Sequence, residues 1–259
     1  MDKAAGPQIA VEIFKESPWG WRYWSMVVSN IWIALLAGYL NAFSTVSLLF
    51  ERSAHMSGRA TDLGRGIMAF FVLTDVAART RLFEEAVIIA IMTVSFVAGA
   101  VLGTKLKAAC GMGKALIMVG LLISVGAVTI YMGLPAGVLN VFSLERAIWA
   151  ILLCVPMGMQ NAVTSLTPIG RSTHITGTLT DLGTAIADKA HSVTVHLSCR
   201  WGGFVLGGSV GLWVFFHLPS LFSQMLILAA ATIITGAFYA HPAIRRKLGK
   251  VIGDPDPKA

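Results

Sequence analysis

Apolar residues along this chain gather in long runs that are separated by short polar or basic links. Six runs lie at 27–50, 84–104, 115–134, 144–163, 193–216 and 220–240. Each holds about 20 residues, and at a helical rise of about 1.5 Å per residue that length crosses roughly 30 Å of hydrocarbon. The pattern predicts an all-α integral membrane bundle of six transmembrane helices.

Two places break this pattern. Residues 65–83 alternate charged residues with apolar blocks, which makes them a poor crossing, and we expect a short re-entrant or interfacial helix there. The fourth run contains Pro156 and Gly158, so its end is expected to be kinked or unwound.

One stretch occurs twice. Residues 55–64 and 174–183 share the pattern His-x-[Ser/Thr]-Gly-x-x-Thr-Asp-Leu-Gly, and upstream the Gly-Tyr-Leu-Asn-Ala of 38–42 resembles the Gly-Met-Gln-Asn-Ala of 158–162. Each half of the chain holds three runs, with the motif after the first. Because three is odd, two such units joined end to end must lie in opposite orientations. The sequence therefore predicts two inverted three-helix repeats, a recurring transporter plan.

The repeat also divides the chain. The predicted parts are a cytoplasmic or interfacial N-terminal segment (1–24), the first repeat (25–134), a linker (135–143), the second repeat (144–240) and a basic cytoplasmic tail (241–259). The first part lacks the basic, apolar and small-residue pattern of a cleavable signal, so the first helix is expected to remain in the protein.

Composition agrees with a membrane protein, since 56% of the residues are hydrophobic and 13% are charged, against about 25% charged in soluble domains. In a six-span arrangement thirteen of the 20 Lys and Arg residues fall on the side of the termini, six on the other side, and Arg200 inside a span. The positive-inside rule then places both termini in the cytoplasm of a bacterial inner membrane. Topology accounts for the net charge of +7, so no nucleic-acid partner is expected. The three cysteines lack ligand spacing, and neither a metal nor a cofactor is expected.

The repeated motif has the residue types of a polar binding site. Ser57 and Thr176 precede good helix formers and are predicted N-caps, and a helix start offers free N–H groups and a positive dipole end to an anion. The alternative is that these groups only satisfy one another's hydrogen bonds. If the two copies meet, they form one site, whose predicted substrate-binding residues are His55, Ser57, Asp62, His174, Thr176, Asp181, Asn41, Gln160 and Asn161.

Two arginines are candidates for coupling or gating. Arg59 stands where the second copy has Thr178 and so breaks the symmetry of the motif. Arg200 lies within a predicted span, where a charge costs about 2.5–3.5 kcal/mol, and such residues pair, line a path, or snorkel toward the interface.

The pairing of Gly-x-x-Asn-Ala with a Ser/Thr-Gly element, above all 158–162 followed by 176–178, resembles the YoaK-like bacterial membrane proteins. The likeness covers roughly 30–240. The resemblance implies a fold of about six spans but no reaction, because that family is of unknown function. Its members usually carry Asp where Asn41 stands and Thr-Gly-Asn in place of 57–59, so a shared substrate is not implied.

These patterns favour a small secondary transporter or channel-like carrier of a small polar or anionic solute. A homodimer is expected, because six spans match half of a major-facilitator-type transporter. The alternative is a non-catalytic accessory or assembly subunit of a larger membrane complex, including one that contacts pigment or haem. An enzyme is not expected, and no residue is assigned a catalytic role, since neither Ser-x-x-Lys nor His-Glu-x-x-His occurs.

Overall fold

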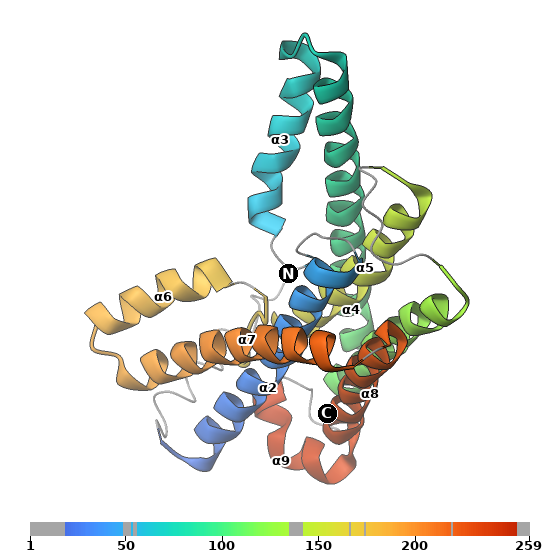
Figure 1. The fold of residues 1–259 in the computed structure, drawn as a ribbon. Helices are drawn as coiled ribbons and strands as arrows, with labels where there is room; N and C mark the ends of the chain where they lie inside the picture. Colours follow the sequence, from blue (N-terminus) through green and yellow to red (C-terminus); the bar gives the residue numbers. More distant parts are fainter. Residues whose placement is uncertain are drawn as a thin grey trace.

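A computed structural model describes residues 19–48, 53, 56–134, 142–165, 167–173, 175–218 and 220–252. All of the elements within these ranges are helical, which confirms the all-α prediction. They are α2 (Trp21–Phe43), the π-helical turn η1 (Ser44–Leu48), α3 (Met56–Val72), α4 (Val76–Tyr131), α5 (Leu144–Ser165), α6 (Ile175–Ala187), α7 (His191–His217), α8 (Leu221–Ala240) and α9 (Pro242–Ile252) (Figure 1).

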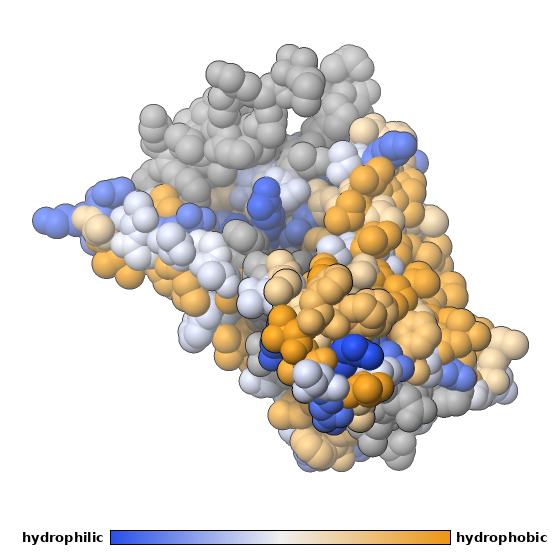
Figure 2. Space-filling view, turned by 90° about the horizontal axis from the view of Figure 1, so that it is seen from above, coloured by the Kyte–Doolittle hydropathy of each residue, from blue (hydrophilic) through white to orange (hydrophobic). Residues whose placement is uncertain are grey.

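Five of the described helices are long and apolar enough to cross a membrane, namely α2 with η1, α4, α5, α7 and α8. Their outer sides carry exposed large apolar residues such as Val94, Trp213, Phe216 and Ile234. Figure 2 shows apolar side chains over a broad part of the surface in view. The chain is therefore a multi-pass helical membrane protein.

Helix α4 differs from the prediction of two spans joined by a basic link. It is a single element of 56 residues, which if straight would measure about 84 Å, far more than one bilayer core. Gly111 interrupts it with φ 83° and ψ 169°, a conformation that glycine adopts without strain from a Cβ. The predicted link is thus a one-residue bend between 76–110 and 112–131.

The short helix expected at 65–83 also has different bounds. Helix α3 ends at Val72, and α4 begins at Val76 after Asp75, whose carboxylate accepts a hydrogen bond from Ala77 N at 3.0 Å. This N-cap satisfies an amide at the start of α4 and separates the two helices.

The predicted unwinding of the fourth run is wrong. Helix α5 continues through Pro156 and Gly158 to Ser165. Packed neighbouring helices can shield the backbone group that a proline frees, which lets transmembrane helices tolerate it. A departure from α-helical geometry is found instead at the end of α2, where the π-helical turn η1 follows. The predicted segments 1–24, 135–143 and 241–259 lie partly outside the described residues.

Helices α2 and α7 pack closely because three glycines of α7 lie against the backbone of α2. A Cβ on any of them would clash with that backbone, in the pairs Gly203–Ile31, Gly207–Leu35 and Gly211–Tyr39. The two numbers of each pair rise together, so α2 and α7 run in the same direction. Small residues that let backbones approach are typical of helix contacts in membranes.

The crossing of α4 with α5 repeats these contacts. Gly99 lies against Val155, and Gly103 lies against Met159, so these helices also run in the same direction. Gly207 is 108 residues after Gly99, and Leu35 is 120 residues before Val155. The next contact pairs along the two crossings, Gly211–Tyr39 and Gly103–Met159, are related by the same two sequence separations.

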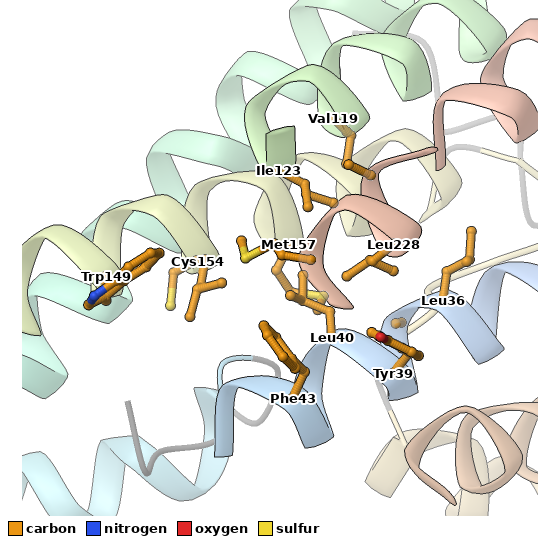
Figure 3. Close-up of a cluster of buried hydrophobic side chains, with 14 of the residues drawn as sticks. Leu36, Tyr39, Leu40, Phe43, Val119, Ile123, Trp149, Cys154, Met157 and Leu228 are labelled. Atoms are coloured by element: carbon orange, nitrogen blue, oxygen red, sulfur yellow. The ribbon is translucent and has the colours of Figure 1, made fainter. Parts of the chain in front are cut away.

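The second part of α4 packs on α8 in the opposite direction. Gly120 lies against Ile233, and Gly236 lies against Ile117, so one number rises as the other falls. Beneath these crossings, α2, α4, α5 and α8 share an apolar core. In Figure 3 the side chains of Leu40, Ile123, Met157 and Leu228 point toward one another from these four helices.

Candidate functional site

A polar cluster lies inside the bundle, at the crossing of α2 with α7. It consists of Asn30, His196 and Arg200, of which 1%, 3% and 9% of the surface is exposed. Arg200 Nε donates to Asn30 Oδ1 at 3.1 Å, and its Nη2 lies 3.2 Å from His196 Nε2 and also donates to the carbonyl oxygen of Ile169. The cluster thus connects two helices with the loop after α5.

The hydrogen bonds of the cluster specify the state of His196. Its Nε2 faces Asn30 Nδ2 at 3.2 Å as well as Arg200 Nη2. Amide and guanidinium nitrogens can only donate, so Nε2 must accept, and the proton of this neutral imidazole is on Nδ1. The guanidinium of Arg200 therefore holds the charge of the cluster.

The loop 167–173 is shaped to receive Arg200. Gly170 has φ 79°, and a Cβ there would lie 3.1 Å from Arg200 Cζ and closer still to Nη2. Thr167 Oγ1 donates to Thr164 O at 2.7 Å and accepts from Ile169 N at 3.1 Å. Glycine is required here both for its positive φ and for the close approach of the guanidinium.

Gln160 and Asn161, two of the predicted substrate-binding residues, form hydrogen bonds with the elements that surround the cluster. Gln160 Nε2 donates to Ile33 O of α2 at 3.2 Å. Asn161 Oδ1 accepts from Thr173 Oγ1 at 2.9 Å and from Thr173 N at 3.4 Å. Gln160 thus contacts the helix that bears Asn30, and Asn161 ties the loop 167–173 to α5.

The first half of the chain places its polar groups at the end of α2. The carbonyl of Asn41 accepts from Ser44 Oγ at 2.9 Å and from Thr45 Oγ1 at 2.7 Å. Ser44 Oγ also lies within hydrogen-bond distance of Ser53 Oγ, at 3.0 Å. These bonds connect the predicted residue Asn41 with the stretch that precedes the first motif.

The prediction that Ser57 and Thr176 are N-caps is wrong, because both helices begin two residues earlier than those caps imply. Helices α3 and α6 begin at Met56 and Ile175, so Ser57 and Thr176 are the second helical residues, and Thr176 is exposed. His55 and His174, and the side chain of Ser57, lie outside the described residues.

The motif acids interact differently in the two copies. Asp62 pairs with Arg59 and with Arg65, each at 3.5 Å. Asp181 is exposed on α6 and interacts electrostatically with Arg200. Helices α3 and α6 both start toward the centre of the molecule and run outward (Figure 1). The meeting of the two motifs in one site stays a prediction.

The repeated motif includes further buried residues that were not among the predicted site residues. The repeat extends upstream as Arg-Ser-x-His, which places Ser53 and Ser172 at matching positions, both buried. Ser172 Oγ has no hydrogen-bond partner among the described residues. Asn30, an amide inside the first apolar run, could also have been singled out from the sequence.

Residues 207–211 read Gly-Gly-Ser-Val-Gly, the spacing of a hydrolase nucleophile turn. They lie within α7, and Ser209 Oγ donates to Val205 O of the preceding turn at 3.1 Å. The strand-to-helix turn that such a nucleophile needs is therefore not formed at this place.

An apolar cleft of about 600 Å³ lies where α2 begins and α8 ends. Trp21, Trp24, Trp32 and Phe238 are among its lining residues, and none of the described residues that line it is charged. Such a lining suits an acyl chain better than a polar solute.

Comparison with known proteins identifies the family. Residues 29–239 match the family described as protein of unknown function (DUF1275), an uncharacterised family as the YoaK-like resemblance implied. No curated protein and no solved structure matches the chain. With most of its length covered, the chain belongs to this family of helical membrane proteins of unknown function.

Proposed function

We propose that this protein is a small secondary transporter or channel-like carrier of a small polar or anionic solute. Its site would lie between two inverted three-helix repeats. The observation that carries the proposal is the matched pair of helix crossings, α2 on α7 and α5 on α4, with each glycine set against the corresponding backbone position.

Helix directions support six crossings, with α4 counted as two that are joined at the Gly111 bend. In a chain that crosses six times, the first and fifth crossings point the same way, as do the second and fourth, while the third and sixth are opposed. The contacts of α2 with α7, of 76–110 with α5 and of 112–131 with α8 have these three relations.

The contact of α4 with α8 supports an inverted relation between the halves. Gly236 is 116 residues after Gly120, and Ile233 is 116 residues after Ile117. Exchanging the halves therefore turns the Gly120–Ile233 contact into the Gly236–Ile117 contact. Equivalent helices that meet antiparallel are related by a two-fold axis perpendicular to them, which in a bilayer lies in the membrane plane.

Solute recognition would use the two motif copies near this axis. Asn41 and Asn161 are at corresponding positions. The backbone carbonyl of Asn41 accepts from Ser44 at the end of α2, and the side chain of Asn161 accepts from Thr173, which adjoins the second motif. Alternating exposure of such a site requires two similar halves that rock against each other, which the repeated crossings provide. We further propose a homodimer in the inner membrane with both termini in the cytoplasm.

Topology is the first test. Thr61 and Thr180 are exposed residues at matching positions of α3 and α6. Single cysteines there, in a background without Cys110, Cys154 and Cys199, should react with an impermeant reagent from opposite membrane faces. Reaction from the same face would remove the inverted repeat.

Solute flux is the second test. Proteoliposomes should take up at least one solute from a panel of anions, amino acids and neutral polyols. Asn161→Ala should slow that uptake, while Thr104→Ala, at an exposed residue outside both motif copies, should not. No uptake of any solute by folded protein would refute transport. A stoichiometric partner or coloured cofactor in gentle detergent would favour an accessory subunit instead.

A further inference from the structure

The buried charge of Arg200 is not matched by a buried carboxylate. Arg200 lies in a helix long and apolar enough to cross the membrane, where an unpaired charge is costly. Its bonded partners are an amide oxygen, a carbonyl oxygen and a neutral imidazole. No carboxylate of the described residues forms an ion pair with Arg200, and the one that interacts with it, Asp181, belongs to the exposed side of α6.

The crossing of α4 with α5, which matches that of α2 with α7, has apolar residues at the positions that correspond to the cluster. The separations of 120 and 108 residues that relate the two crossings carry Asn30 to Ala150, His196 to Ile88 and Arg200 to Met92. All three counterparts are buried members of the apolar core. The crossing of α4 with α5 therefore packs this place with apolar side chains, as buried ion sites can often be replaced without loss of stability.

A second buried group, in the loop 167–173 that Arg200 contacts, lacks a partner among the described residues. Ser172 has 1% of its surface exposed, and its Oγ makes no hydrogen bond within the described residues. It lies in the same loop as Ile169, whose carbonyl accepts from Arg200. A buried hydroxyl without a partner costs free energy unless something else bonds to it.

From these observations we infer that the Asn30–His196–Arg200 cluster with Ser172 binds an anionic group, a carboxylate or a small inorganic oxyanion. The inference rests on the proposed carrier function and narrows its substrate class from polar or anionic solutes to anions. Arg200 supplies the charge and a planar donor set that suits an oxyanion, and Ser172 supplies a hydroxyl donor. Neutral His196 and Asn30 hold the guanidinium in place. The matching crossing of α4 with α5, with Ala150, Ile88 and Met92 at the corresponding positions, has apolar residues in place of such a site.

Anion binding to purified protein tests this without any need for flux. Thermal unfolding is followed by tryptophan fluorescence at constant ionic strength, with chloride replaced stepwise by acetate, succinate, nitrate, sulfate or phosphate. We expect a saturable rise in the unfolding midpoint with at least one carboxylate or oxyanion. No saturable rise with any of these anions would overturn the inference.

Three variants locate the site. Ser172→Ala should not lower the unfolding midpoint in the absence of anion, and it should weaken anion binding about tenfold, the loss of one hydrogen bond to a charged group. Arg200→Met, which copies Met92, should abolish the midpoint shift. Arg65→Gln, at an exposed cation whose side chain is 64% accessible, is the matched control and should retain it.

A triple variant provides a second test in case Arg200→Met alone does not fold. Asn30→Ala, His196→Ile and Arg200→Met together give the crossing of α2 with α7 the apolar residues of the crossing of α4 with α5, so this protein should fold and should not bind the anion. Saturable binding that persists in Arg200→Met or in the triple variant would overturn the inference. Binding without flux would refute the carrier and leave the anion site, whereas flux of neutral solutes without anion binding would do the reverse.

Discussion

The close crossing of α2 and α7 predicts a specific cost for one added methyl group. In Gly207→Ala the new Cβ would lie 2.7 Å from Leu35 Cα and closer still to the Leu35 carbonyl oxygen, whereas ordinary contacts begin at 3.4 Å. Backbone atoms cannot rotate away, so the two helices must separate by about 0.7 Å or more. Forced overpacking of this kind costs about 1–3 kcal/mol.

The control for this change lies on the same helix. Nothing lies within 4 Å of a Cβ built at Gly202, so Gly202→Ala changes only the helix propensity, in the stabilising direction by roughly 0.5–1 kcal/mol. Gly207→Ala and Gly202→Ala share this gain in helix propensity. The difference between them therefore isolates the packing cost, and Gly207→Ala should be the less stable by about 1–3 kcal/mol.

Equilibrium unfolding in mixed micelles, followed by tryptophan fluorescence, measures this difference. Gly99→Ala should behave as Gly207→Ala does, because its Cβ would lie 2.9 Å from Val155 Cα at the matching crossing. Equal stability of Gly207→Ala and Gly202→Ala would refute the close approach. A cost at Gly207 without one at Gly99 would refute the equivalence of the two crossings.

Three further substitutions have defined outcomes in the same unfolding assay. Gly111→Ala should destabilise by about 1–3 kcal/mol, because φ 83° with ψ 169° is a region that only glycine adopts freely. Trp32→Phe should cost about 0.5–1.5 kcal/mol through loss of the 2.7 Å bond from its Nε1 to Thr235 Oγ1, and Thr235→Val should cost a similar amount, with no further loss in the double variant. Asp62→Asn should cost less than about 1 kcal/mol, because its pair with Arg59 is long at 3.5 Å and its side chain is 35% accessible.

Several features of this protein follow from its sequence alone. The apolar runs determine which segments can cross a membrane, because hydrophobicity and length are local properties of the chain. Four of the five candidate spans correspond to single predicted runs, and the fifth, α4, joins two of them. The duplicated motif likewise drew attention to Gln160 and Asn161, whose side chains both make inward hydrogen bonds.

Boundaries were less predictable where one residue decides them. A basic stretch between two apolar runs looks like a loop, but a single glycine with a positive φ suffices to bend α4. Proline in α5 looks like a break, but the helix continues past it. The torsion angles at such residues depend on neighbouring helices, and residue type alone does not report them.

Only the tertiary structure decided what Arg200 contacts. Asn30 lies 170 residues away in sequence, and Ile169 lies 31 residues away. Their meeting depends on the rotation and register of α2 and α7, which the glycine contacts set and which hydrophobic periodicity cannot specify. The sequence by itself determined a duplicated membrane chain with one arginine inside a span. The packed helices decided that this charge belongs to only one of the two matching crossings, because the other is filled by Ala150, Ile88 and Met92.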